Sequence, residues 1–138
     1  MPRNNKILKI NSGSVTLHEI ETFIEDIFKS FGLSHTDFNR SMLCVKEAVT
    51  NSIVHGNKLD GNKQVSIMAY KCNKYLYFKI IDEGEGFDYS QISDPTSEEN
   101  ILKESGRGLF LIKNVCDGFS FKDNGKVLEI KINIHEKY

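Results

Sequence analysis

The sequence has no excess of charge of either sign and no long hydrophobic run. Its 138 residues include 18 Lys and Arg against 19 Asp and Glu, a formal net charge of −1. A near-neutral total gives neither the basic footprint of a protein that binds duplex nucleic acid nor the polybasic signal of a membrane-surface protein. No stretch approaches the ~20 apolar residues of a membrane-spanning helix, and residues 1–10 are too charged for the hydrophobic part of a signal peptide. We therefore expect a cytoplasmic protein with no direct nucleic-acid partner and no membrane partner.

Cysteines are few, and none are paired in a CxxC motif. Cys44, Cys72 and Cys116 lie far apart in the chain, which is typical of free thiols in a reducing compartment rather than of a metal or disulfide site. Internal repeats, low-complexity tracts and linkers are also missing. Because 39% of the residues are hydrophobic and 27% charged, the composition is that of a globular protein and excludes wholesale disorder. The length fits a single domain over residues 1–138.

Hydrophobic periodicity predicts three helices. The first covers residues 16–31, and Gly32 supplies the left-handed residue that ends it. The second begins near residue 34 or 36 and continues to about residue 54. The third covers residues 108–117, and we expect Gly118 to end it.

Short β-prone runs, most with alternating apolar residues, predict five strands. The last two strands flank Asn124-Gly125, a strong signal for a two-residue hairpin turn, and residues 82–105 form a long connection without periodicity. Two hairpins with grouped helices predict an α+β fold, a two-layer sandwich in which helices cover one face of a mainly antiparallel sheet. The predicted strands are residues 6–10, 64–69, 75–80, 119–122 and 127–134.

The second helix carries an unusual polar stripe. Glu47, Asn51 and His55 are spaced four residues apart and project from one face. A carboxylate, an amide and an imidazole in line provide a potential base, a neutral oxygen ligand and a second titratable group. The alternative is a surface acid, a solvated amide and a histidine favoured by the helix dipole at the C-terminal end.

A second motif follows the predicted strand 75–80. Asp82 lies where this apolar strand ends, and Gly84 and Gly86 allow a flat or charged ligand to approach the backbone closely. The aspartate can accept a hydrogen bond from an amino group held there. The spacing lacks the pattern of an EF-hand calcium loop, and a plain acidic turn is the alternative.

A third motif, Gly106-Arg107-Gly108, leads into the third helix. A glycine-rich helix N-terminus presents free amides to an anion, and Arg107 adds a charge with bidentate geometry for phosphate. No Gly-Lys-Ser/Thr follows, so the motif is not a Walker loop. Two glycines that end a flexible loop are the alternative.

In this order, the three motifs resemble the N, G1 and G2 boxes of the GHKL ATP-binding superfamily, which includes histidine-kinase catalytic domains, gyrase, the Hsp90 chaperone and MutL. The resemblance covers residues 35–134. Within the superfamily, the chain is most similar to the anti-sigma regulatory factor serine/threonine kinases. The resemblance implies a single histidine kinase-like ATP-binding domain with a Bergerat-type fold.

The resemblance also implies roles for individual residues. Asn51 would coordinate Mg²⁺ through its amide oxygen, and Glu47 would be the general base for the attacking hydroxyl. Asp82 would accept a hydrogen bond from the adenine amino group of ATP, beside a wall shaped by Gly84 and Gly86. The triphosphate would be held by Gly106, Arg107, Gly108 and Leu109.

Two points stay open within the resemblance. Residues 89–105 would form a lid over ATP, but Lys103 is its one basic residue before Arg107, so the contacts of the γ-phosphate are undefined. His55 is expected among the nucleotide-binding residues, where it either touches a phosphate or only fixes the end of the helix.

The function implied is that of a kinase that transfers the γ-phosphoryl of ATP to a STAS-type anti-sigma-factor antagonist and also binds a sigma factor. A homodimer is implied as well, to which strand 6–10 would contribute an exposed edge. The alternative is a non-catalytic ATP-binding module that regulates a protein partner without phosphorylating it. A simple ATPase is the least favoured possibility, because other members couple hydrolysis to movement through further domains, which we do not expect here.

Overall fold

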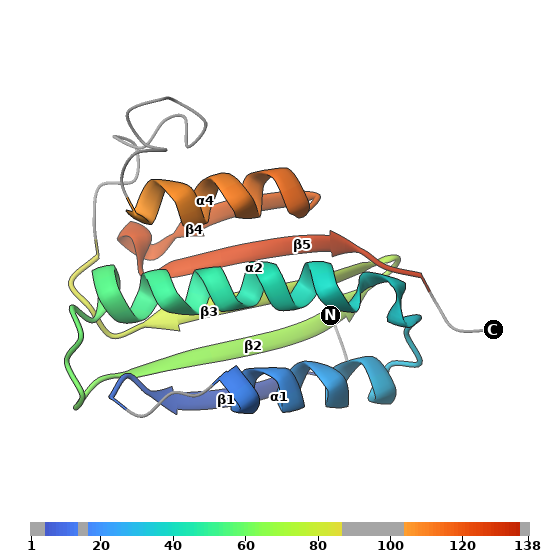
Figure 1. Cartoon of the computed structure of the whole chain (residues 1–138), viewed down its shortest axis with the longest axis horizontal. Coiled ribbons are helices and arrows are strands. Elements are labelled where there is room, and N and C mark those ends of the chain that lie inside the picture. The colour runs from blue at the N-terminus through green and yellow to red at the C-terminus, as the bar shows by residue number, and fades with distance from the viewer. Residues whose placement is uncertain (1–4, 14–16, 87–103, 136–138) are drawn as a thin grey trace.

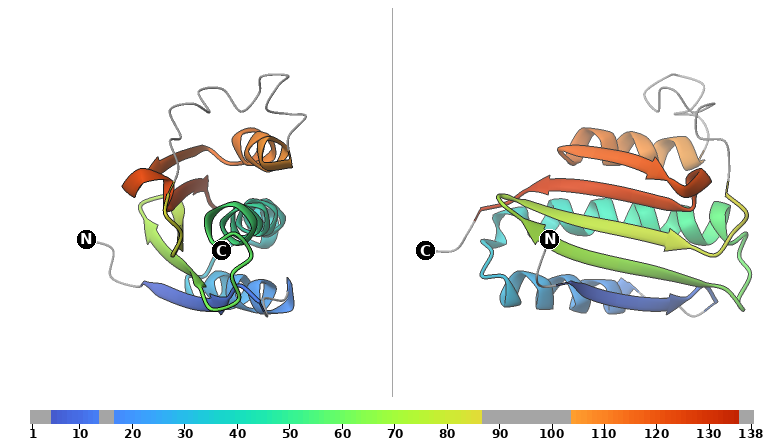
Figure 2. Two further views of the ribbon diagram at one scale, coloured as in Figure 1. Left: turned by 90° about the vertical axis from the view of Figure 1, so that its left-hand side faces the viewer. Right: turned by 180° about the vertical axis from the view of Figure 1, so that it is seen from behind.

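The chain folds into two layers, a five-stranded sheet and a layer of helices on one of its faces (Figures 1 and 2). The structure is a computed structural model that describes residues 5–13, 17–86 and 104–135. Within this part, elements follow one another in the predicted order of strands and helices. Their bounds are β1 (Lys6–Asn11), α1 (Leu17–Ser30), α2 (Phe38–Asn51), β2 (Gln64–Cys72), β3 (Tyr75–Asp82), α4 (Glu104–Val115), β4 (Gly118–Lys122) and β5 (Val127–Asn133).

The sheet has the strand order β1-β2-β3-β5-β4, and every neighbouring pair is antiparallel. The helix α2 lies between α1 and α4 and crosses the middle of the sheet (Figure 1). Turned by 90°, the molecule shows the three helices on one side of the sheet (Figure 2). The predicted α+β two-layer sandwich is therefore confirmed.

The core lies between the two layers. Alternate residues of the central strands face the helices, as the period-2 pattern predicts, and residues such as Phe78 and Ile130 are completely buried. From the helix side, Ile24 and Ile27 are equally buried. Full burial of such a side chain contributes about 1.5–3 kcal/mol, so the apolar stripes of helix and strand hold the layers together.

The second helix ends differently from the prediction. After α2, residues Ser52–Gly56 continue as a π-helical turn, in which the N–H of Asn57 donates to the carbonyl of Ser52 at 2.7 Å. A short 3₁₀ turn, His35–Asp37, precedes α2. The π turn widens the helix, and His55 and Gly56 are thereby carried toward the end of β3.

The third helix begins four residues earlier than predicted, at Glu104, and ends at Val115. Gly118 is the first residue of β4 and not a helix-ending residue. The glycines of the third motif therefore lie inside the helix, where each costs about 1 kcal/mol relative to alanine. Close packing of Gly108 against α2, described below, explains why the helix tolerates it.

The last hairpin is also wider than predicted. Lys122 pairs with Val127, so the connection has the four residues 123–126 instead of a two-residue turn. Asp123, Asn124 and Gly125 all have positive φ angles, 50°, 55° and 86°. Gly32 has a φ of 64°, as expected of a residue that ends a helix.

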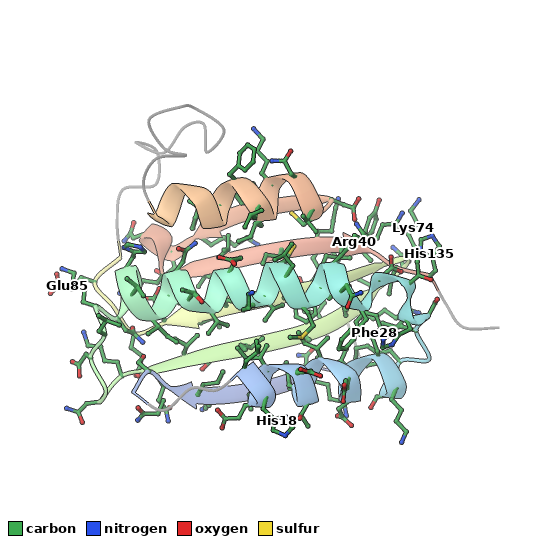
Figure 3. All side chains as sticks on the ribbon, viewed as in Figure 1. His18, Phe28, Arg40, Lys74, Glu85 and His135 are labelled. Carbon is green, nitrogen blue, oxygen red and sulfur yellow. The ribbon has the colours of Figure 1, made fainter. Side chains whose placement is uncertain are left out.

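An ion pair between the buried Asp37 and the partly exposed Arg40 joins the elements at the end of the molecule opposite Glu85 (Figure 3). Arg40 Nη2 lies 3.1 Å from Asp37 Oδ1 and donates to the carbonyl of Asn133 at 2.7 Å. The N–H of His135 donates to Asp37 Oδ2 at 2.9 Å, and its ring Nδ1 lies equally close. Burial alone would raise the pKa of Asp37, but the hydrogen bonds from His135 and Arg40 outweigh it and lower that pKa.

Candidate functional site

A pocket of about 190 Å³ lies where the C-terminal end of α2, the end of β3, α4 and the last hairpin meet. Asn51 and Asp82 supply polar groups to its wall, and Ala48, Leu109 and Leu128 supply apolar ones. Such a mixture of an apolar wall and a few polar groups is typical of small-molecule sites. The lining residues are Ala48, Asn51, Ser52, His55, Gly56, Asp82, Leu109, Phe121, Gly125, Lys126 and Leu128.

Near Asn51, α4 approaches α2 through Gly108. A Cβ atom on Gly108 would lie 3.1 Å from Asn51 Nδ2 and 3.4 Å from Glu47 Oε2. The absence of a side chain there lets the helix backbone sit directly beside both polar groups. The structure thus brings together two of the three predicted motifs, which are more than 50 residues apart in the chain.

Asn51 carries a side-chain amide group without a partner. Its Nδ2 is buried and donates a hydrogen bond to none of the described residues. A buried polar group left unsatisfied costs about 1–3 kcal/mol, and native proteins keep few of them. Because Asn51 also lines the pocket, this orphaned amide is a candidate group for holding a ligand.

Asp82, on the pocket wall, is held by hydrogen bonds of its backbone and its side chain. Its side chain is buried, its backbone N–H donates to the carbonyl of Lys126 at 3.0 Å, and the N–H of Gly84 donates to its Oδ1 at 2.9 Å. Burial raises the pKa of Asp82, while the Gly84 N–H and the charges of Lys126 and Lys63 oppose the rise. No described residue donates to Oδ2, so this oxygen is free to accept a hydrogen bond from a ligand.

The π-helical turn and the end of β3 are in close contact, with the backbone of Gly56 lying against the side chain of Asp82. A Cβ atom on Gly56 would overlap the carboxylate of Asp82, and one on Gly84 would overlap the carbonyl of Gly56. Gly84 therefore packs against the backbone of Gly56, beside Asp82, and is not itself among the residues that line the pocket. Gly56 was missed as a site residue, because nothing local in the sequence shows that it meets a strand end 26 residues later.

Of the other predicted residues, some line the pocket and some do not. Leu109 is buried in the pocket wall, and His55 is exposed at its rim. Gly86, with a φ of 84°, lies against the carbonyl of Asn124 and not in the pocket wall. It shapes the site indirectly, by letting the chain after β3 pass close to the last hairpin.

Gly106 and Arg107 belong to the first turn of α4. The backbone N–H groups of a first turn have no partners within the helix, so this turn still offers donors to an anion, although it begins before the glycines. The side chain of Arg107 and the predicted lid up to residue 103 lie outside the described part of the chain.

Sequence reasoning also missed the wall opposite α2. Phe121, Lys126 and Leu128 come from the last hairpin, whose Asn124-Gly125 signal predicts a turn and gives no hint of a pocket. Among the described residues, no group of three or more His, Cys, Asp or Glu could hold a metal ion. A divalent cation at Asn51 would need oxygen ligands from a bound molecule, which is the usual way in which Mg²⁺ is held beside phosphates.

An antiparallel sheet covered on one face by helices, with a pocket between an acceptor carboxylate and an unpartnered amide, defines the class of histidine kinase-like ATPases. Residues 12–132 match the family described as histidine kinase-like ATPase domain, and the chain belongs to that family. The GHKL resemblance and the Bergerat-type fold are thereby confirmed.

The chain is similar to bacterial serine-protein kinases named RsbW. It is 30% identical to the enzyme of Staphylococcus epidermidis over 119 residues, which cover 80% of this chain and 75% of the relative. It is 29% identical to the enzyme of Staphylococcus aureus strain JH9 over the same coverage. In the part of the chain that the structure describes, no helix has the length and apolar character to cross a membrane.

Proposed function

We propose that the chain is an anti-sigma regulatory factor that acts as a Mg-ATP-dependent protein serine/threonine kinase, with a STAS-type antagonist as substrate and a sigma factor as second partner. The observation that carries the proposal is that Gly108 packs beside Glu47 and Asn51, and that Asn51 and Asp82 line the same pocket. The similarity to serine-protein kinases supports it.

Asp82 is suited to recognise the base of ATP. Asp82 lines the pocket, its Oδ2 has no donor among the described residues, and a carboxylate oxygen accepts a hydrogen bond from the 6-amino group of adenine. Phe121, Leu109 and Leu128 provide apolar surface for the flat ring. The adenine is thus placed at the strand end, with its phosphates directed toward α4.

Asn51 and the first turn of α4 are suited to hold the phosphates. The amide oxygen of Asn51 is a hard ligand of the kind that Mg²⁺ prefers, and the orphaned Nδ2 can donate to a phosphate oxygen. The free backbone N–H groups of the first turn of α4 add further donors. When bound, Mg²⁺ would supply charge neutralisation on the phosphates, which is the main requirement of phosphoryl transfer.

Glu47 is suited to take the proton of the attacking hydroxyl. It lies on α2 one turn before Asn51, half-buried, with Oε2 beside Gly108. As the new bond between the serine oxygen and the γ-phosphorus forms, the bond from that phosphorus to the ADP oxygen breaks, and the hydroxyl proton passes to the Glu47 carboxylate. Alignment of these groups supplies most of the catalysis.

A homodimer forms the last part of the proposal. The edge strand β1 pairs with β2 on one side, and no described strand pairs with its other side. Ile7 on this strand is 55% exposed, a large apolar side chain at an open edge. Unpaired edges invite pairing with a second chain, and sedimentation equilibrium of the purified protein tests this.

The kinase is tested by incubating the purified protein with radiolabelled ATP, Mg²⁺ and the STAS-type protein of the same organism. We expect label on a serine of that protein, and a loss of about 10²–10⁴-fold in rate for Glu47→Gln with ATP binding retained. Glu21→Gln, an exposed glutamate on α1, is the matched control and should leave the rate unchanged.

The alternative, a non-catalytic ATP-binding module, makes a different prediction in the same experiment. It requires stoichiometric binding of the partner with no label, unaffected by Glu47→Gln. Release of phosphate from ATP without label on any partner would favour the simple ATPase instead.

A further inference from the structure

Asn57 is the most completely hydrogen-bonded side chain near the pocket, although it does not line it. It follows the π-helical turn directly and is 1% exposed. Its Oδ1 accepts the backbone N–H of Glu83 at 2.8 Å, and its Nδ2 donates to Ser12 Oγ at 2.9 Å and to the carbonyl of Gln64 at 3.0 Å. One buried amide therefore joins three separate segments of the chain.

These hydrogen bonds use both the oxygen and the nitrogen of the Asn57 side-chain amide. The acceptor half holds the segment after β3, and the donor half anchors Asn57 to the end of β1 and the start of β2. Glu83 adds a second link, because its Oε1 accepts the backbone N–H of Gln64. No other side chain of similar size presents an acceptor and two donors in this geometry.

The segment held in this way positions Asp82. Glu83 is the next residue, and the N–H of Gly84, one residue further, binds Asp82 Oδ1. Gly84 also packs against the carbonyl of Gly56, immediately before Asn57. The hydrogen bond from the Glu83 N–H to Asn57 Oδ1 therefore fixes the turn that holds the carboxylate of Asp82, a residue of the pocket wall.

We infer that Asn57 is a positioning residue for base selection, which acts through Glu83 and Gly84 to fix the acceptor oxygen of Asp82. The inference rests on the proposed ATP site. A carboxylate in this position accepts from the 6-amino group of adenine and opposes the 6-oxo group of guanine, which is itself an acceptor. A displaced Asp82 loses this discrimination as well as affinity, since selectivity of this kind depends on the geometry of the buried polar group.

The test measures the affinities for ATP and GTP, both with Mg²⁺, by isothermal titration calorimetry of the full chain. For Asn57→Ala we expect at least a tenfold loss of ATP affinity and at least a fivefold fall in the ratio of ATP to GTP affinity. Ser12→Ala is the matched control: it removes one anchor of Nδ2 and leaves the bond to Glu83, so the melting temperature falls but the affinity ratio is kept. Asn57→Asp keeps an acceptor for the Glu83 N–H and should also keep the ratio.

A purely structural role gives a different result. The inference is overturned if Asn57→Ala keeps the wild-type ratio, or if Ser12→Ala lowers the ratio as far as Asn57→Ala does. If Asn57→Ala does not fold, Asn57→Asp becomes the test. A lower ratio of ATP to GTP affinity in Asn57→Asp overturns the inference, and an unchanged ratio supports it. If the wild-type protein binds no ATP at all, the proposed function itself fails, which is a distinct outcome.

Discussion

Gly56 and Asp82 are packed so closely that the position of Gly56 has no room for any side chain. A Cβ atom there would overlap both the carboxyl carbon and the oxygens of Asp82. The π-helical turn after α2 and the strand β3 thus meet at the group proposed to recognise the base. This contact makes Gly56 part of the site although it contributes no functional group.

Gly56→Ala is expected to displace Asp82 and to lower ATP affinity at least tenfold. Overpacking in a tight contact costs about 1–3 kcal/mol, so the melting temperature should fall as well. The measurement is titration calorimetry with Mg-ATP, alongside thermal unfolding followed by circular dichroism. Unchanged affinity in a folded Gly56→Ala protein would show that Asp82 does not contact the base.

Gly61→Ala is the matched control for this change. Gly61 is exposed, and a Cβ atom there would meet nothing closer than the Cα of Gly13 at 3.8 Å, an ordinary contact. The control substitutes the same atoms in the loop that follows the π turn. It should keep both the affinity and the melting temperature of the wild type.

The fold was predictable where the pattern is local. Alternation along β3 predicts which side chains, such as Phe78 and Ile80, face the helices, because strand periodicity depends only on backbone geometry. The last hairpin was not predictable in the same way. Asp123 and Asn124 adopt positive φ angles beside Gly86, a contact between segments nearly 40 residues apart that no local signal encodes.

The same distinction between local and long-range contacts applies to the candidate site. Glu47 and Asn51 share a helix face, so their spacing alone predicts that they lie together. That Asp82 meets Gly56 depends on where β3 ends relative to α2, which is set by packing of the two layers. The contact with Lys126 was not predictable either. Its carbonyl accepts a hydrogen bond from the Asp82 N–H, whereas its position in the sequence indicates only a turn.

Asp37→Asn is expected to lower the free energy of unfolding by about 1–3 kcal/mol at neutral pH, because it removes the charge of a buried carboxylate that is hydrogen-bonded to the partly exposed Arg40. The folded-state pKa of Asp37 is lowered, so its stabilisation is present above the unfolded value near 3.8 and is lost as the pH falls through the folded value. Urea unfolding between pH 2 and pH 7 checks both effects. Wild type should lose stability below about pH 4 more steeply than the variant.

Asp26→Asn, at an exposed position of α1, removes the same charge without the ion pair. It should leave the free energy of unfolding within about 0.5 kcal/mol of the wild type. Equal losses for the two variants would mean that net charge, and not the contact with Arg40 and His135, determines the acid stability.

The three cysteines should differ in their reactivity toward a thiol reagent such as DTNB. Cys72 is exposed at the end of β2, whereas Cys44 is fully buried, and its hydrogen bond with Cys116 together with burial raises its pKa. We expect one fast thiol per native chain and a total of three in denaturant. Cys72→Ser should remove the fast phase; a fast phase that persists in this variant would contradict the assignment.

Asn51 and Asn57 provide the sharpest contrast between a binding residue and a positioning residue. Asn51 Nδ2 is buried without a partner in the described part of the chain, whereas every polar group of the Asn57 side chain is bonded. Asn51→Ala removes an unsatisfied donor, so the ligand-free protein should be as stable as the wild type or more stable by about 1 kcal/mol. Asn57→Ala should instead destabilise it by about 1–3 kcal/mol.

Nucleotide binding should separate the two variants further. Asn51→Ala should lose the Mg²⁺ dependence of ATP binding, measured by titration with and without EDTA, while it keeps the preference for ATP over GTP that Asp82 provides. Asn57→Ala should show the reverse, a weakened preference with the Mg²⁺ dependence retained. A destabilised Asn51→Ala protein with unchanged Mg²⁺ dependence would mean that the amide serves the packing of α2 against α4 rather than the phosphates.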